Sequence, residues 1–246
     1  MQISIIKEQN TIEQRVAGTP ESLRNLFNLG AEVLVEKGAG LLSGFNDDSY
    51  QSIGAKVVDR SKCLSADICL CVRMPNNDDI NLIKENSILI GLLNPYKNKN
   101  YFKSLNNRKI TTCSMELIPR ISRAQNMDVL SSQANLAGYR SVIDAAEKFN
   151  KAFPMMMTAA GRINPAKVMV LGVGVAGLQA IATAKRLGAV VCATDVRIAT
   201  KEQVESLGAK FVMVENNDNI EESETKSGYA IEMSDEYKKK TIYAYS

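Results

Sequence analysis

Short apolar segments alternate with amphipathic ones along most of the 246-residue chain. Several apolar segments have the length and residue types of β-strands, and the segments between them have helical spacing. This alternation is typical of parallel α/β folds. We therefore expect an α/β fold with two Rossmann-like parallel-sheet domains. The predicted strands are residues 3–6, 32–35, 67–72, 88–92, 109–113, 167–171, 190–194 and 210–214.

Two helical segments define the predicted domain organisation. "PESLRNLFNLG" has Pro20 at a helix start and Gly30 just past its end, the usual places for these residues. A longer helix, residues 128–150, is predicted from the spacing of apolar residues between Val129 and Ile143. It would connect an N-terminal Rossmann-like domain (residues 1–126) to a dinucleotide-binding domain (residues 127–246).

Composition excludes several classes of function. The formal net charge is only +3 and the basic residues are scattered, so we expect no nucleic-acid partner. No apolar run approaches the ~18 residues that span a bilayer, and the N-terminus lacks a signal-peptide pattern, so we expect a cytoplasmic chain without direct membrane insertion.

Cysteine and histidine usage bears on chemistry. The five cysteines form no Cys-x-x-Cys motif and there is no histidine, so we expect no metal site. Cys69 and Cys71 alternate along "ADICLCVR", which places both on one face of a strand, in a core. The usual proton-transfer residue at neutral pH is absent.

The glycine motif in residues 167–197 carries the clearest chemistry. Gly172, Gly174 and Gly177 form G-x-G-x-x-G after an apolar strand and at the start of a helix. Gly172 permits the tight turn, Gly174 lets the backbone approach a pyrophosphate, and Gly177 lets helix and strand pack closely. Asp195 follows the next strand, 18 residues past Gly177, close to the ~20 expected for a dinucleotide site.

Asp195 also predicts the choice of cofactor. Its carboxylate would accept hydrogen bonds from the adenine ribose and repel a 2′-phosphate, which favours NAD(H) over NADP(H). Arg197 leaves the alternative open, because an arginine can accommodate that phosphate. Val175 and Val196, beside the motif residues, and Arg197 itself belong to the predicted cofactor site.

With these residues, the chain resembles the alanine dehydrogenase and proton-translocating transhydrogenase family, and within it the NAD(H)-binding component of transhydrogenase. The resemblance runs from "KEQNTIEQRVAGTPESL" to "GYAIEMSDEYKKK" and is most specific in "PRISRAQNMDVLSSQANLAGYR". The polar segment 122–140 could by itself be a helix-capping surface loop. The resemblance implies instead a loop that faces the nicotinamide end of the cofactor. The further cofactor-binding residues that it implies are Arg120, Gln125, Asn126, Met127, Asp128, Ser131, Tyr139 and, near the adenosine, Gly228.

The implied reaction is hydride transfer between NAD(H) and NADP(H), the latter bound on a partner component. Such a reaction needs orientation but no catalytic acid or base, so no catalytic residue is expected. The implied partners are the NADP(H)-binding and membrane-embedded transhydrogenase subunits, which would hold the chain at the inner membrane. A homodimer is implied for a complete protein.

Two alternatives remain open at this stage. An alanine dehydrogenase needs an acid–base residue, and the corresponding run "LLNPYKN" contains no histidine. Arg15 and Arg73 lie where such enzymes hold a substrate carboxylate, although we favour ordinary ion-paired arginines. The second alternative is a nucleotide-binding module without catalysis.

The C-terminal part departs from the family pattern. Only three strands are predicted from Lys167 onward, residues 215–228 are polar, and "TIYAYS" does not continue the pattern. We therefore expect the second domain to be incomplete, as a fragment or through a disrupted reading frame, with strand 167–171 as an exposed sheet edge.

Overall fold

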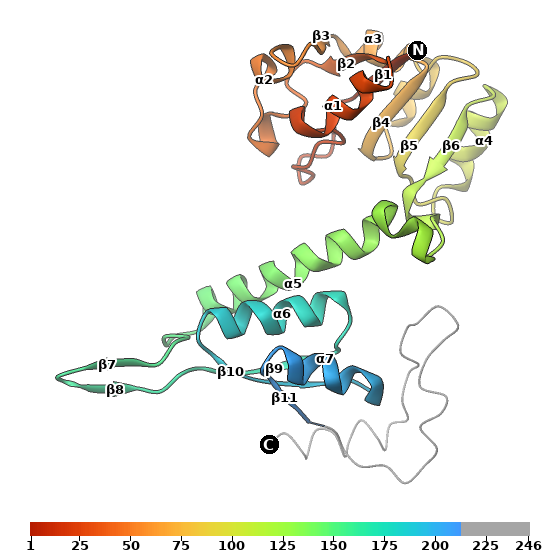
Figure 1. Ribbon diagram of the computed structural model, residues 1–246. Helices are drawn as coiled ribbons and strands as arrows, with labels where there is room; N and C mark the ends of the chain where they lie inside the picture. Colours follow the sequence, from red (N-terminus) through yellow and green to blue (C-terminus); the bar gives the residue numbers. More distant parts are fainter. Residues whose placement is uncertain (213–246) are drawn as a thin grey trace. The chain divides into compact units, whose positions relative to one another are not determined.

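The computed structural model describes residues 1–212. They form two compact units, the first being Met1–Asp128 and the second beginning at Val129. Figure 1 labels their elements. The predicted site residue Gly228 and the end of predicted strand 210–214 lie outside the described residues.

The first unit contains a parallel six-stranded sheet. Its strands lie in the order β3-β2-β1-β4-β5-β6, so the chain returns to the centre of the sheet after β3 and builds outward again. This is the order of a doubly wound fold, with the switch point between β1 and β4. The strands are β1 (Gln2–Ile5), β2 (Glu32–Glu36), β3 (Lys56–Val58), β4 (Ile68–Arg73), β5 (Ile88–Leu92) and β6 (Thr111–Ser114).

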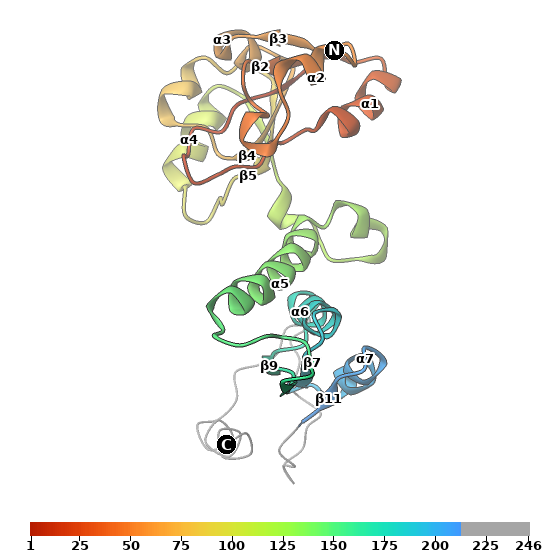
Figure 2. The same ribbon diagram turned by 90° about the vertical axis from the view of Figure 1, so that its left-hand side faces the viewer.

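Helices cover both faces of this sheet, as Figure 2 shows for α1 and α4. Because strand side chains alternate between faces, Val33 and Val35 pack with Leu23 of α1. Leu34 and Leu89 pack on the other face with Leu105 of α4. The helices are α1 (Pro20–Asn28), α2 (Asp47–Gln51), α3 (Arg60–Leu64) and α4 (Lys99–Asn107), with 3₁₀ turns η1 (Leu41–Ser43), η2 (Asn77–Asn81), η3 (Met115–Leu117) and η4 (Ser122–Met127).

The second unit contains one half of such a sheet in its described part. Strands β9, β10 and β11 are parallel and lie in the order β11-β10-β9. Helix α5 packs along α6, and a separate hairpin, β7 with β8, precedes the sheet. The elements are α5 (Val129–Lys148), β7 (Met156–Thr158), β8 (Gly161–Ile163), β9 (Lys167–Leu171), α6 (Val175–Arg186), β10 (Val190–Thr194), η5 (Ile198–Thr200), α7 (Lys201–Ser206) and β11 (Lys210–Phe211).

The predicted α/β, Rossmann-like class is confirmed, as are most strands. Residues 88–92, 167–171 and 190–194 are strands with the predicted bounds. The predicted strand 109–113 begins too early, because Lys109 has a φ of 56° and lies in the left-handed region, so β6 starts at Thr111. Strand β3 and the β7–β8 hairpin were not predicted.

Three further expectations can be compared with the structure. Cys69 and Cys71 are both buried in the same core cluster, as predicted. Helix α1 begins at Pro20, and Gly30 follows its end with a φ of 74°. The polar segment, expected as a loop, instead forms the 3₁₀ helix η4 over Ser122–Met127, because its polar residues fold into successive short turns. Among the described residues, no helix is both long and apolar enough to cross a bilayer.

Candidate functional site

The glycine motif forms the turn between β9 and α6. Gly172 has a φ of 91°, which only glycine adopts without strain, and its N–H donates to the Thr194 carbonyl at 2.9 Å. A Cβ on Gly177 would lie 1.9 Å from the Gly172 carbonyl oxygen. The first and third glycines are therefore required by the backbone itself.

The middle of the turn is open. A Cβ built on Gly174 or Gly172 would meet no heavy atom within 4 Å. Gly174 is the N-cap of α6, and no side chain caps the helix there. The first N–H groups of a helix and its dipole favour an anion, so this open, uncapped helix start fits a diphosphate group.

Asp195 lies directly after β10 and beside the turn. Its side chain is only 4% exposed, and its carboxylate accepts four hydrogen bonds. Val173 N donates to Oδ2 at 2.7 Å, and the Arg197 backbone N–H donates to Oδ1 at 2.9 Å. The Arg197 guanidinium donates through Nε to Oδ1 at 2.8 Å and through Nη2 to Oδ2 at 3.0 Å.

These contacts decide the charge of Asp195. Burial works to raise the pKa of this carboxyl, but the Arg197 guanidinium and the two backbone N–H groups together hold the pKa below its usual value. Asp195 is therefore ionised at neutral pH.

The other predicted site residues fall into both units. In the first, Gln125, Asn126 and Met127 are exposed on η4, and Arg120 Nε lies 4.0 Å from Asp128 Oδ2. In the second, α5 carries a half-buried Ser131 and an exposed Tyr139. The glycine turn and its neighbours Val175, Asp195, Val196 and Arg197 also lie in the second unit.

The first unit has a cavity of about 490 Å³. It lies where β1, β4 and β5 end, beside the switch point of the sheet, and is lined by Lys7, Arg73 and Asn94 among others. Ligands of open α/β sheets bind at such points. The cavity includes part of the "LLNPYKN" run, where an alanine dehydrogenase would need its proton-transfer residue.

Arg15 and Arg73 share one carboxylate. Arg15 Nη2 lies 2.6 Å and Arg73 Nε 2.9 Å from Glu13 Oε2. The hydrogen bonds from Arg15, and then that from Arg73, outweigh burial and lower the pKa of Glu13 to about 2. The interpretation of these arginines as ion-paired is confirmed.

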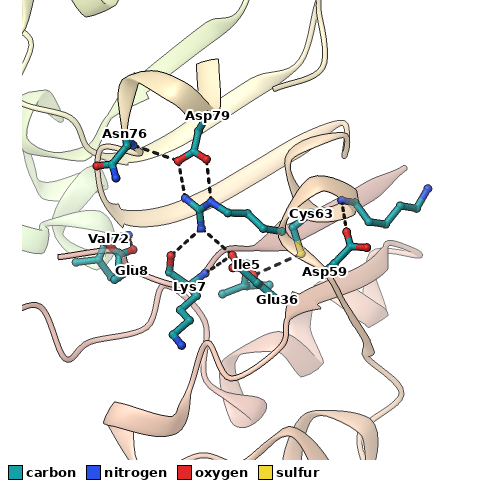
Figure 3. Close-up of polar contacts among 11 residues, drawn as sticks. Ile5, Lys7, Glu8, Glu36, Asp59, Cys63, Val72, Asn76 and Asp79 are labelled. Carbon is teal, nitrogen blue, oxygen red and sulfur yellow. Dashed lines mark hydrogen bonds and ion pairs between the residues drawn. The ribbon is translucent and has the colours of Figure 1, made fainter. Parts of the chain in front are cut away.

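An ion-pair cluster that the sequence did not reveal stands at the same sheet edge. Arg60 donates to both Asp79 oxygens at 2.9 and 2.7 Å, and to Glu36 and the Lys7 carbonyl at 2.8 and 3.0 Å. Figure 3 shows these acceptors converging from separate elements. The partners lie 19 and 24 residues from Arg60 in the sequence, so no local motif could have indicated the cluster. We call Arg60, Glu36 and Asp79 the arginine clasp.

The described residues contain no cluster of three or more histidine, cysteine, aspartate or glutamate side chains that could hold a metal ion. All five cysteines are free thiols.

Comparison with known families matches both units of the chain. A family model described as "Alanine dehydrogenase/PNT, N-terminal domain" matches residues 4–137. A second, "Alanine dehydrogenase/PNT, C-terminal domain", matches residues 141–239. The glycine turn and Asp195 lie within the second match.

Individual proteins resemble the chain over nearly all of its length. An NAD(P) transhydrogenase subunit alpha protein of Rhodospirillum rubrum is 54% identical over 251 residues, which cover 99% of this chain and 65% of the relative. The crystal structure of a transhydrogenase from Sinorhizobium meliloti is 53% identical, with a TM-score of 0.84, covering 86% of this chain and 64% of that one.

An "L-alanine dehydrogenase" structure is more distant. It is 25% identical, with a TM-score of 0.77, and the similarity covers 86% of this chain and 60% of that one. The chain thus spans somewhat less than two thirds of the length of each of these proteins.

Proposed function

The chain belongs to the alanine dehydrogenase/PNT family, and on that premise we propose that it is an NAD(H)-binding part of a proton-translocating transhydrogenase. The observation that carries the proposal is the open glycine turn with the buried, ionised Asp195 beside it. The two relatives that are more than half identical to the chain are both named transhydrogenases, which supports the choice within the family.

In this proposal the second unit holds the adenosine half of NAD(H). The N–H groups at the start of α6 bind the diphosphate across Gly174, and Val175 and Val196 border it. Asp195 accepts hydrogen bonds from the ribose hydroxyls. Gly228, outside the described residues, is proposed to lie near the adenosine.

The polar residues around η4 are proposed to orient the nicotinamide end. Gln125, Asn126 and Asp128 offer amide and carboxylate groups suited to a carboxamide and a ribose. Arg120, Met127, Ser131 and Tyr139 complete the proposed set. The bound nicotinamide supplies the hydride chemistry itself, so these side chains need only fix its position and keep competing orientations out.

The reaction class agrees with the composition of the chain. Hydride transfer between two nicotinamides moves no proton to or from a substrate, so a chain without histidine can support it. NADP(H) would be bound on a partner component, and membrane-embedded subunits would conduct protons and hold the chain at the membrane. We also propose a homodimer for the assembled protein.

Alanine dehydrogenase activity is the less favoured function within the family. The two arginines that could hold a substrate carboxylate are already paired with Glu13. The cavity beside them is lined by Asn94, whose amide side chain cannot accept and return a proton at neutral pH.

Cofactor preference tests the binding part of the proposal. We expect NADH to bind the purified chain more tightly than NADPH, as followed by nicotinamide fluorescence. Asp195→Ala should weaken NADH binding by roughly tenfold, as expected for hydrogen bonds to a charged group, and narrow the preference. Asp144→Ala, which removes an exposed carboxylate of α5, serves as the charge control. Equal affinity of the unmodified chain for both cofactors would contradict the proposal.

Two assays on the same preparation test the reaction. One follows alanine-dependent reduction of NAD⁺, and the other follows hydride transfer to NADP⁺ after the NADP(H)-binding and membrane components are added. We expect activity only in the second. Activity only in the first would assign an alanine dehydrogenase, and cofactor binding without either activity would assign a binding module.

A further inference from the structure

Asp195 has no acceptor capacity to spare. A carboxylate offers about four lone-pair sites, and the four hydrogen bonds from Val173 and Arg197 use them all. A ribose hydroxyl can therefore bond to Asp195 only if one of these donors leaves.

The donors differ in their freedom to leave. Val173 is 1% exposed and follows Gly172, whose own N–H is bonded to Thr194. The Arg197 backbone N–H lies at the start of η5, where the Thr200 N–H donates to the Arg197 carbonyl at 3.2 Å. The guanidinium, in contrast, is carried by rotatable bonds and is 16% exposed. Displacing it requires no change in the backbone.

We propose that Arg197 is a latch on Asp195, which a dinucleotide must open. This inference rests on the proposed function, that the turn binds NAD(H). Binding exchanges the two guanidinium hydrogen bonds of Asp195 for bonds from the ribose hydroxyls. The released cation then lies beside the ribose 2′ position.

The latch makes two contributions to recognition. Its opening opposes the binding of every dinucleotide, because a well-aligned, partly buried bidentate ion pair is stronger than an exposed one. Once open, the cation attracts a 2′-phosphate and offsets part of the repulsion from Asp195. Arg197 therefore lowers NAD(H) affinity and narrows the discrimination against NADP(H).

Arg197→Met tests the latch, because methionine fills much of the same space and has no donor. We expect NADH to bind about three- to tenfold more tightly, the range for losing a partly exposed charge-assisted pair. NADPH should gain less or lose affinity. Arg197→Lys keeps the charge but cannot bridge both oxygens, so it should fall between. Arg186→Met, which removes an exposed charge from the last turn of α6, controls for net charge.

The double variant Asp195→Ala, Arg197→Met shows whether the effect passes through Asp195. In the Asp195→Ala background the gain from Arg197→Met should vanish, and a gain that persists there would overturn the latch. Unchanged or weaker NADH binding by Arg197→Met, with the melting temperature preserved, would overturn the latch and leave the proposed function standing. Failure of every variant and of the unmodified chain to bind NADH or NADPH would overturn both.

Discussion

At the scale of single residues, the glycines of the turn have separable roles. Gly177 is excluded from carrying a side chain by a carbonyl oxygen 1.9 Å from its Cβ position, whereas Gly174 faces open space and has a φ of −84°. One residue is therefore needed for packing, and the other is available to a ligand.

Alanine at each position distinguishes these roles. Gly177→Ala should destabilise the second unit by about 1–3 kcal/mol, the usual cost of overpacking. Gly174→Ala should leave the melting temperature within a few degrees of the unmodified chain but weaken NADH binding, because its methyl group enters the proposed diphosphate position. Thermal melting and NADH titration of both variants provide the measurement. Normal NADH binding by Gly174→Ala would argue against a diphosphate at this turn.

The sequence predicts these residues better than it predicts their contacts. The spacing of Gly172, Gly174 and Gly177 locates the turn, because each glycine has a backbone requirement that spacing alone reveals. The engagement of Asp195 by Arg197 could not be predicted, since the pattern specifies only that a charged residue is present. The direction of a guanidinium depends on side-chain rotamers that no spacing encodes.

At the scale of elements, the arginine clasp ties together the end of β2, the start of α3 and the turn η2. Glu36 and Asp79 are 9% and 4% exposed, and Arg60 neutralises both. Removing one partner of a buried pair leaves an uncompensated charge, which costs more than the pair contributes.

Arg60→Met should therefore destabilise the first unit by about 3 kcal/mol. Lys56→Met is the matched control, because it breaks the exposed pair with Glu32 and should cost less than about 1 kcal/mol. Chemical denaturation of both variants provides the comparison. Similar losses of unfolding free energy for the two would show that the clasp acts as an ordinary surface pair.

The elements that the sequence missed share a physical cause. Strand β3 has three residues, none fully buried, and all six residues of the β7–β8 hairpin are exposed. Neither has the apolar alternation that burial imposes, so periodicity could not reveal them. Strand β5, in contrast, alternates between buried and half-buried residues, and its bounds were predicted correctly.

At the scale of the whole molecule, the same βαβ logic appears in both units. The first sheet continues past its switch point with β4, β5 and β6, while the described sheet of the second unit stops at β9. Strand β9 thus has one described neighbour, β10. Its other edge presents backbone groups that no described strand pairs, next to Leu171, which is 73% exposed.

Such an edge is a template for pairing with another chain. We expect the 246-residue chain to self-associate as its concentration rises, as measured by sedimentation velocity. Leu171→Lys places a charge on this edge and should reduce the association. Val190→Lys makes a similar change at a half-exposed position of β10, which is paired on both sides, and should reduce it less. A chain that stays monomeric at all concentrations, or equal effects of the two substitutions, would show that the edge of β9 is covered in solution.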